Sequence, residues 1–313
     1  MWTLSRYLLR RHLAPFGFAF AALTALMLSN QITKLVPGLL GKGLPQSEIV
    51  AVFVLSLPFI VAVTLPMAVL IAVLRVFTRL GADSELRAMK PGGVSALHLI
   101  TPVLGGAACV AALSFLWNDQ VLPRANYRLR TLQVAIERKD PSFTTEYKSD
   151  REMTIAELRR GARSAREDAD RAAGDGRQAI ERAGRQRAAT YEVEIQKKYA
   201  IAAACFVFAL VGAPVALWFH RRGVRLVLEM SSGLFTLYYV GLIGGEELGD
   251  RGIVSPFFAM WTPNLILGIV GLGAVWWVRK RTNASPTGSS ATYRVGKGDA
   301  SISQAPTQEE GDK

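Results

Sequence analysis

The residues best placed to do chemistry in this chain lie in a charged segment, residues 75–93, which follows a long apolar stretch. Asp83 or Ser84 can cap a short helix there, and Pro91 can end it. That helix would carry Glu85, Leu86, Arg87 and Met89, whose charges and single apolar face suit a groove on a soluble protein. The alternative is an ordinary amphipathic connector on a membrane surface.

The chain offers little for catalysis or for an energy source of its own. A phosphate-binding loop is absent, since Gly41, Lys42 and Gly43 form only a lone Gly-Lys pair, and there is no nucleophile elbow. Ionisable residues are also missing from the middle of the apolar stretches, where ion-coupled transporters hold their relay groups. We therefore expect neither an enzyme nor a cofactor, and any active transport must be powered by a partner.

Cysteine and histidine residues do not form a metal-binding pattern. Cys109 and Cys205 each fall inside an apolar stretch, which predicts packing roles. His12, His98 and His220 lie near the ends of such stretches without the i, i+4 spacing of a helical metal site. We interpret these histidines as interfacial, with metal binding as a remote alternative.

Six apolar stretches dominate the chain and must position everything else. They cover residues 13–33, 49–74, 94–117, 199–219, 226–245 and 253–278. A helix needs roughly 20 apolar residues to cross the hydrocarbon, where its backbone groups must be satisfied internally. The fold class predicted is therefore an all-α polytopic membrane protein with six transmembrane helices.

Basic residues predict the orientation of these helices. The chain start, the two connections after the second and fourth stretches, and the region after the sixth stretch hold most of them: Arg6, Arg10, Arg11, Arg75, Arg79, Arg87, Lys90, Arg221, Arg222, Arg225, Arg279, Lys280 and Arg281. The opposite short connections hold only Lys34, Lys42 and Arg251. The positive-inside rule then places both termini in the cytoplasm. It also explains much of the excess of 37 basic over 25 acidic residues, so nucleic acid is not an expected partner.

The stretches divide the chain into four parts. Residues 1–117 hold the first three transmembrane helices and the charged loop, and residues 199–281 hold the last three. Residues 118–198 form a mainly helical periplasmic insertion, whose length allows it to cross regardless of its charge. Residues 282–313 are polar and are expected to form a disordered cytoplasmic tail.

Within the insertion, residues 150–198 are rich in helix-forming Ala, Arg and Glu. Asp150 is the expected N-cap of a helix over residues 151–160, and the Gly174, Asp175, Gly176 triplet predicts a turn between two polar helices. Its apolar positions are too sparse for a large core. We expect either a helical hairpin or a partly mobile stalk.

Several motifs resemble the LptF/LptG permease family. They are Leu57-Pro58 and Leu65-Pro66, the run from Asp83 to Met89, Val121 to Asn126, Ser149 to Thr154, and the sequence PFFAMWTPN from Pro256 to Asn264. The resemblance covers most of the membrane part and is specific as a set. It implies a subunit of the ABC transporter that extracts lipopolysaccharide from the inner membrane.

In that family two six-span subunits form a V-shaped cavity above a dimeric cytoplasmic ATPase. The resemblance thus implies an ATPase dimer, a sister permease subunit, which can be a second copy, and periplasmic lipid-bridge proteins as partners. It makes the helix around Glu85 the coupling helix, with Glu85 as a polar anchor and Leu86 and Met89 as apolar knobs.

The chain departs from the family in its periplasmic part. Family members carry a β-jellyroll between the third and fourth spans, whereas this segment is too short and too helical for one. Extraction can therefore be retained while the handoff surface is missing or comes from another chain. Two alternatives stay open: a non-transporting scaffold of the same fold, and an exporter of a different lipid.

Cations at the periplasmic rim are candidates for binding the lipid. Lipid A has phosphates and several acyl chains, so its site should be apolar within the bilayer and ringed by cations outside. Lys34, Lys42, Arg124 and Arg128 have suitable positions. The alternative is that they snorkel to ordinary headgroups.

Overall fold

The computed structural model describes residues 2–40, 46–82, 96–138, 148–219 and 223–283. Its α-helices are α1 (Trp2–Leu40), α2 (Gln46–Ala82), α4 (Ala96–Leu116), α5 (Leu122–Arg138), α6 (Ile155–Gly174), α7 (Gln178–Trp218), α8 (Gly223–Asp250) and α9 (Pro256–Asn283). A π-helical turn, η1 (Trp117–Val121), joins α4 to α5, and a 3-10 turn, η2 (Asp150–Glu152), precedes α6. The described residues contain no β-strand.

Six helical segments are long and apolar enough to cross a membrane. They lie in α1, α2, the α4–η1–α5 unit, α7, α8 and α9, so each predicted apolar stretch falls on one of them. The prediction of an all-α polytopic membrane protein is confirmed.

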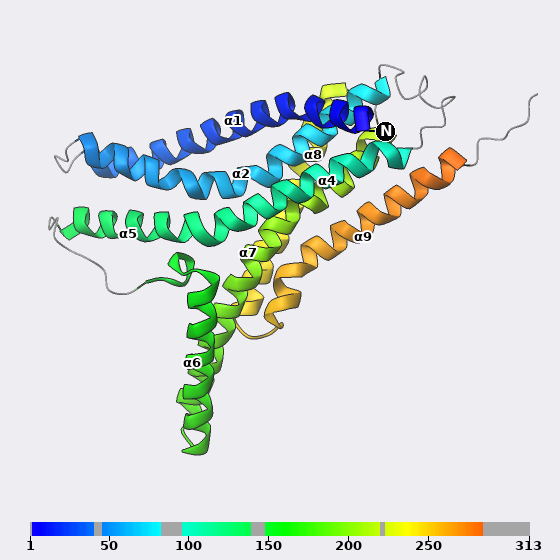
Figure 1. The fold of residues 1–313 in the computed structure, drawn as a ribbon. Helices are drawn as coiled ribbons and strands as arrows, with labels where there is room; N and C mark the ends of the chain where they lie inside the picture. The colour runs from blue at the N-terminus through cyan, green and yellow to red at the C-terminus, as the bar shows by residue number, and fades with distance from the viewer. Residues whose placement is uncertain (1, 41–45, 83–95, 139–147, 220–222, 284–313) are drawn as a thin grey trace, which may run out of the picture.

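Helix α7 is the central element of the fold. It contacts α2, α4, α6, α8 and α9, as the ribbon in Figure 1 illustrates. Its fully buried Phe208 and Ala204 join Leu70 and Phe77 of α2 and Tyr238 of α8 in the main apolar core. In contrast, only 6% of the most apolar window of α1 is buried, which leaves that helix largely exposed along the side of the bundle.

The fourth span and the second polar helix of the insertion form one continuous helix, which the sequence did not indicate. Helix α7 has 41 residues, equivalent to about 60 Å at 1.5 Å per residue. The hydrocarbon core of a bilayer is only about 30 Å thick. Roughly half of α7 therefore projects beyond the membrane, where it pairs with α6 and extends away from the other helices in Figure 1.

The part of the insertion over residues 155–198 is a helical hairpin, which decides between the two predicted forms. Helix α6 ends at Gly174 and α7 begins at Gln178, with Gly176 at a φ of 70° in the turn, as the Gly-Asp-Gly triplet predicted. Its small core contains Ile155, Leu158, Ala162, Ala165, Ala188, Tyr191 and Ile195. Small residues, mainly alanine, allow α6 and α7 to approach closely. The approach is closest to its limit at Gly184, where an added Cβ would lie 3.0 Å from the Ala165 carbonyl oxygen.

The predicted N-cap at Asp150 is wrong. Asp150 lies in the 3-10 turn, and Thr154 caps α6 instead. The Thr154 hydroxyl accepts a hydrogen bond from the Glu157 amide at 3.3 Å, while the Glu157 carboxylate accepts one from the Thr154 amide at 2.8 Å. This reciprocal capping box satisfies two amides at once and fixes the helix start four residues later than predicted.

Helix α8 packs through a row of glycines. A Cβ on Gly241 would lie 2.9 Å from Pro263, one on Gly245 only 2.0 Å from the Ala259 carbonyl oxygen, and one on Gly249 2.7 Å from Val193. The spacing of four residues puts all three on one face of the helix. Small residues at this spacing let helices approach closely in membranes, and here they join α8 to α9 and α7.

Candidate functional site: predicted contacts and the cluster at the hairpin base

The predicted coupling residues lie outside the described part of the structure. Asp83, Ser84, Glu85, Leu86, Arg87 and Met89 all fall within residues 83–95. Helix α2 ends at Ala82 and α4 begins at Ala96, so these two helices bracket the loop. Its role in coupling stays a prediction.

Three of the four predicted substrate cations are described. Lys34 is exposed on α1, whereas Arg124 and Arg128 are exposed on α5, and Lys42 lies outside the described residues. Arg124 donates a 3.5 Å hydrogen bond to Gln120 within its own helical unit. Helices α1 and α5 both contact α2. Binding of a lipid phosphate by these residues stays a prediction.

A cluster of charged residues that was not predicted lies at the base of the hairpin. This hairpin-base cluster comprises Asp119, Arg130, Arg151, Glu152, Glu194, Lys197, Lys198 and Glu246. At its centre the Lys198 side chain is only 5% exposed, and its Nζ donates to the Met153 carbonyl at 2.6 Å. The Asp119 carboxylate lies 4.0 Å from this ammonium group.

The π-helical turn between α4 and α5 brings Asp119 to the cluster. The Asp119 carboxylate accepts a hydrogen bond from the Ile155 amide at 2.7 Å, at the start of α6. In the same turn, Asn118 is buried and the Trp117 indole donates to the Pro58 carbonyl of α2 at 3.0 Å. An extra residue in a helical turn changes the direction of its side chains, and here it turns Asp119 toward the hairpin.

The segment of residues 149–155 links the part of the cluster on α5 to the part on α8. Glu152 is 6% exposed, pairs with Arg130 of α5 at 3.4 Å and accepts from the Ser149 amide at 3.0 Å. Arg151 reaches Glu246 of α8 at 3.1 Å. The segment is therefore tied to three of the membrane helices as well as to α6.

Lys197 completes the network on α7. Its ammonium group lies 2.6 Å from Glu194 of the same helix and 2.8 Å from Glu246 of α8. The carboxylate of Glu246 thus joins Lys197 and Arg151, which come from two different elements. Buried charges are tolerated when each has a partner, and these charges are paired.

Beside the cluster, Lys148 stabilises the start of α6. It donates to the Glu157 carboxylate at 2.8 Å. This bond, together with the one from the Thr154 amide, lowers the pKa of Glu157 from 4.5 to about 2. Glu157 is therefore ionised throughout the physiological pH range. Its carboxylate accepts hydrogen bonds from both the Thr154 amide and Lys148.

The cluster connects elements of the fold that are far apart in the chain. Its groups neutralise one another and fasten the hairpin to α5 and α8. The described residues contain no group of His, Cys, Asp and Glu arranged to hold a metal ion. Cys109 is exposed and Cys205 is buried, and both are unbonded thiols.

The sequence did contain a signal for this cluster. Ser149 to Glu152 and Thr154 to Glu157 both follow the capping-box pattern of Ser or Thr followed three residues later by Glu, and both boxes form. Two such boxes in succession indicate a tightly folded connection. Asp119 and Lys198 were missed because each lies just past the end of an apolar stretch, where a charge is expected for reasons of topology.

Taken together, these features define a multi-pass α-helical membrane protein whose third and fourth spans are joined by a clamped helical hairpin. A family model described as "Lipopolysaccharide export system permease LptF/LptG" matches the chain over residues 6–149 and 141–280. The chain belongs to this LptF/LptG family, a family of transporter components rather than enzymes, as the motifs predicted. The search of curated proteins gives no match.

Proposed function

We propose that this chain is a permease subunit of an ABC transporter that extracts lipopolysaccharide, or a similar anionic glycolipid, from the inner membrane for export. The family match over residues 6–149 and 141–280 is the observation that carries the proposal. Six membrane-spanning helices without a phosphate-binding loop support an energy source outside the chain. A dimeric cytoplasmic ATPase would supply it.

The proposed arrangement follows the distribution of basic residues. Both termini lie in the cytoplasm, as does the loop of residues 75–93 between α2 and α4, where Glu85 contacts the ATPase. Residues 118–198 then lie in the periplasm, and Lys34, Lys42, Arg124 and Arg128 face the lipid phosphates at that side. A sister subunit or a second copy completes the transport cavity.

The helical hairpin determines how cargo would leave. The described residues of the insertion form helices and no strand. The hairpin therefore does not offer the sheet edge through which a β-domain can pair with a following lipid-bridge protein. We propose that extraction is retained and that another chain supplies the handoff surface.

A substitution in the loop tests the coupling proposal. Glu85→Lys reverses the charge of the proposed anchor, so co-purification with the ATPase should fall at least tenfold while membrane insertion stays normal. Glu229→Lys is the matched control, because Glu229 is also acidic, lies near the start of α8 and, among the described residues, pairs with Arg225 of its own helix at 2.7 Å.

The comparison of these two variants is decisive. Unchanged ATPase association in Glu85→Lys, with a level of membrane-inserted protein equal to wild type, would remove Glu85 from the interface. An equal loss in both variants would point to a general effect of charge at that membrane surface.

The hairpin in place of a β-domain also favours a second candidate, a non-transporting scaffold of the same fold. Depleting the chain in cells separates the two functions. Lipopolysaccharide accumulates in the inner membrane if the chain transports it, and its distribution stays normal if the chain is only a scaffold.

A further inference from the structure

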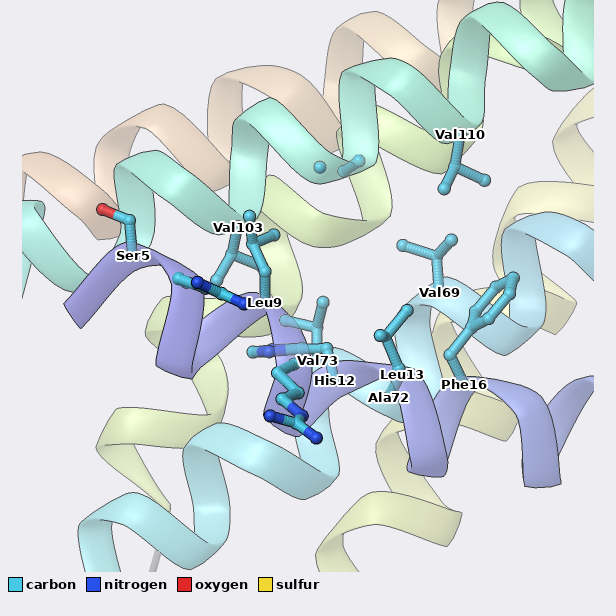
Figure 2. A pocket seen from close by; sticks show the side chains of 14 residues that line it. Ser5, Leu9, His12, Leu13, Phe16, Val69, Ala72, Val73, Val103 and Val110 are labelled. Carbon is cyan, nitrogen blue, oxygen red and sulfur yellow. The ribbon is translucent and has the colours of Figure 1, made fainter. Parts of the chain in front are cut away.

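A cavity of about 770 Å³ lies between the first half of α1, the second half of α2 and the middle of α4. Figure 2 shows Leu9, His12, Leu13 and Phe16 of α1 on one side of it, with side chains of α2 and α4 opposite. None of the predicted substrate residues lines this cavity. We propose that it binds one anionic phospholipid, with the phosphate on Arg6 and Arg10 and an acyl chain in the apolar interior.

The interior of the cavity is apolar and of suitable size. Its walls include Phe16, Val69, Val73, Val103 and Val110. The volume of about 770 Å³ falls within the range of roughly 300–1,000 Å³ that is usual for small-ligand sites. From Arg6 to Phe16 the cavity follows α1 for about 15 Å, at 1.5 Å per residue, which is half of a hydrocarbon core of about 30 Å. It therefore has the depth of one lipid leaflet.

One end of the cavity is cationic. Arg6 and Arg10 both line it, and their spacing of four residues puts them on the same face of α1. Both side chains are exposed, and neither has an ion-pair or hydrogen-bond partner among the described residues. Two guanidinium groups in this position match a phosphate, which arginine binds through paired hydrogen bonds.

His12 adds to the cavity wall one ring nitrogen, Nε2, that has no hydrogen-bond partner among the described residues. The side chain is 9% exposed, and its Nδ1 donates to the Leu8 carbonyl at 2.8 Å. In the neutral ring, Nε2 is then an acceptor, and it has no hydrogen-bond partner among the described residues. A ligand headgroup with a hydroxyl, or a water that the headgroup holds, would satisfy this nitrogen.

The position of the cavity favours a lipid over a soluble anion. Leu9 and Leu13 line it and are 39% and 66% exposed, so its side opens past apolar groups on the outer face of α1. An acyl chain can enter directly from the bilayer, whereas an inorganic phosphate would leave the apolar interior unfilled. The arginines are also among the basic residues that the positive-inside rule assigns to the leaflet rich in anionic lipids.

Native mass spectrometry of the full chain tests the proposal. Protein in nanodiscs of phosphatidylethanolamine and phosphatidylglycerol should retain one phosphatidylglycerol in preference to phosphatidylethanolamine when the disc is removed. Arg6→Gln and Arg10→Gln should each reduce this preference about tenfold, because each removes a charge-assisted hydrogen bond to phosphate. Val110→Phe, which fills the interior, should reduce retention of any lipid.

Arg11→Gln is the matched control. Arg11 is adjacent to Arg10 but does not line the cavity, and its guanidinium lies over the Tyr7 ring at 5.3 Å. This variant should keep the wild-type preference. The proposal is overturned if wild-type protein shows no preference, or if Arg11→Gln loses as much as Arg10→Gln. The measurement needs neither ATPase nor transport, so its outcome is independent of the proposed function.

Discussion

Single residues at the base of the hairpin connect elements that are far apart in the chain. Asp119 holds the Ile155 amide at 2.7 Å and faces Lys198 at 4.0 Å, so one carboxylate joins the third span, the hairpin and the fourth span. Lys198 is nearly inaccessible, with 5% of its side chain exposed. A buried ammonium group without its counter-charge is costly, which makes this pair testable by removing either partner.

Asp119→Ala should destabilise the protein by about 3–5 kcal/mol, because it removes the carboxylate that pairs with the buried Lys198 ammonium group. Adding Lys198→Met removes the orphaned charge and should recover part of that loss. The measurement is reversible unfolding in mixed micelles, analysed as a double-mutant cycle.

The control for this cycle is Asp168→Ala, because Asp168 is 58% exposed and pairs with Arg171 on the same helix. Its removal should change the free energy of unfolding by no more than about 0.5 kcal/mol. Equal effects of Asp119→Ala and Asp168→Ala would mean that the cluster adds nothing beyond a surface ion pair.

Glu157 makes the stability of the hairpin depend on pH. Hydrogen bonds from Lys148 and from the Thr154 amide lower its pKa from 4.5 to about 2. A depressed carboxylate pKa stabilises the folded state fully above the unfolded value, and this contribution is lost as pH falls from about 4.5 through about 2. The Tm difference between wild type and Glu157→Gln should thus shrink over that window.

The effect should be small, since the Lys148 side chain is 39% exposed and water screens the pair. Thermal unfolding of both proteins between pH 7 and pH 2 measures it. A Tm difference that stays constant across this range would show that the Glu157 charge contributes nothing to folding.

At the scale of elements, the membrane spans were predictable and their continuation was not. Apolar stretches of about 20 residues have one physical solution in hydrocarbon, so all six predicted stretches lie on long helices. Helix α7 begins at Gln178, well before its stretch at residues 199–219, because residues 185–198 consist mostly of helix-forming Ala, Arg, Glu, Gln and Lys and contain neither Gly nor Pro. The extent of an apolar stretch indicates which part of a helix lies in the lipid. It does not indicate where that helix ends.

The π-helical turn and the glycine packing of α8 could not be predicted for a related reason. Both depend on neighbours distant in sequence: Trp117 donates to Pro58 of α2, and Gly245 lies against the backbone of α9. The sequence contains the residue types that permit these contacts, but it does not show which distant residues they contact. The cation rim around Lys34 and the coupling helix around Glu85 were reached through resemblance and stay predictions.

Gly245→Ala tests the packing of α8 on α9. The added Cβ would lie 2.0 Å from the Ala259 carbonyl oxygen, which is backbone and cannot move aside without shifting the helix. We expect a loss of about 3 kcal/mol or more in the free energy of unfolding. Gly244→Ala is the control, because a Cβ there meets nothing within 4 Å.

That adjacent control separates steric conflict from any general intolerance of α8 to substitution. Gly244→Ala should leave stability unchanged or slightly higher, since alanine is the better helix former. Equal stability of the two variants, measured in the same micelles, would show that α8 and α9 do not pack as closely as described.

At the scale of the whole molecule, a projecting helical hairpin is fixed to the bundle of membrane helices. Helix α7 passes from the core of the bundle into the hairpin without a break, and the hairpin-base cluster fixes that hairpin to α5 and α8. If the proposed function is correct, we expect movement of the membrane helices to reach the projecting part through this connection. In the proposed function, the ATPase drives this movement through the loop between α2 and α4.

The most direct test of this account is lipid extraction from proteoliposomes that contain lipopolysaccharide. The chain reconstituted alone should release no lipopolysaccharide to a soluble acceptor, with or without ATP. With its sister subunit and the ATPase, release should require ATP and should be lost in Glu85→Lys. Release by the chain alone, or no release by the complete assembly, would contradict the claim that this chain is a passive permease driven by a separate ATPase.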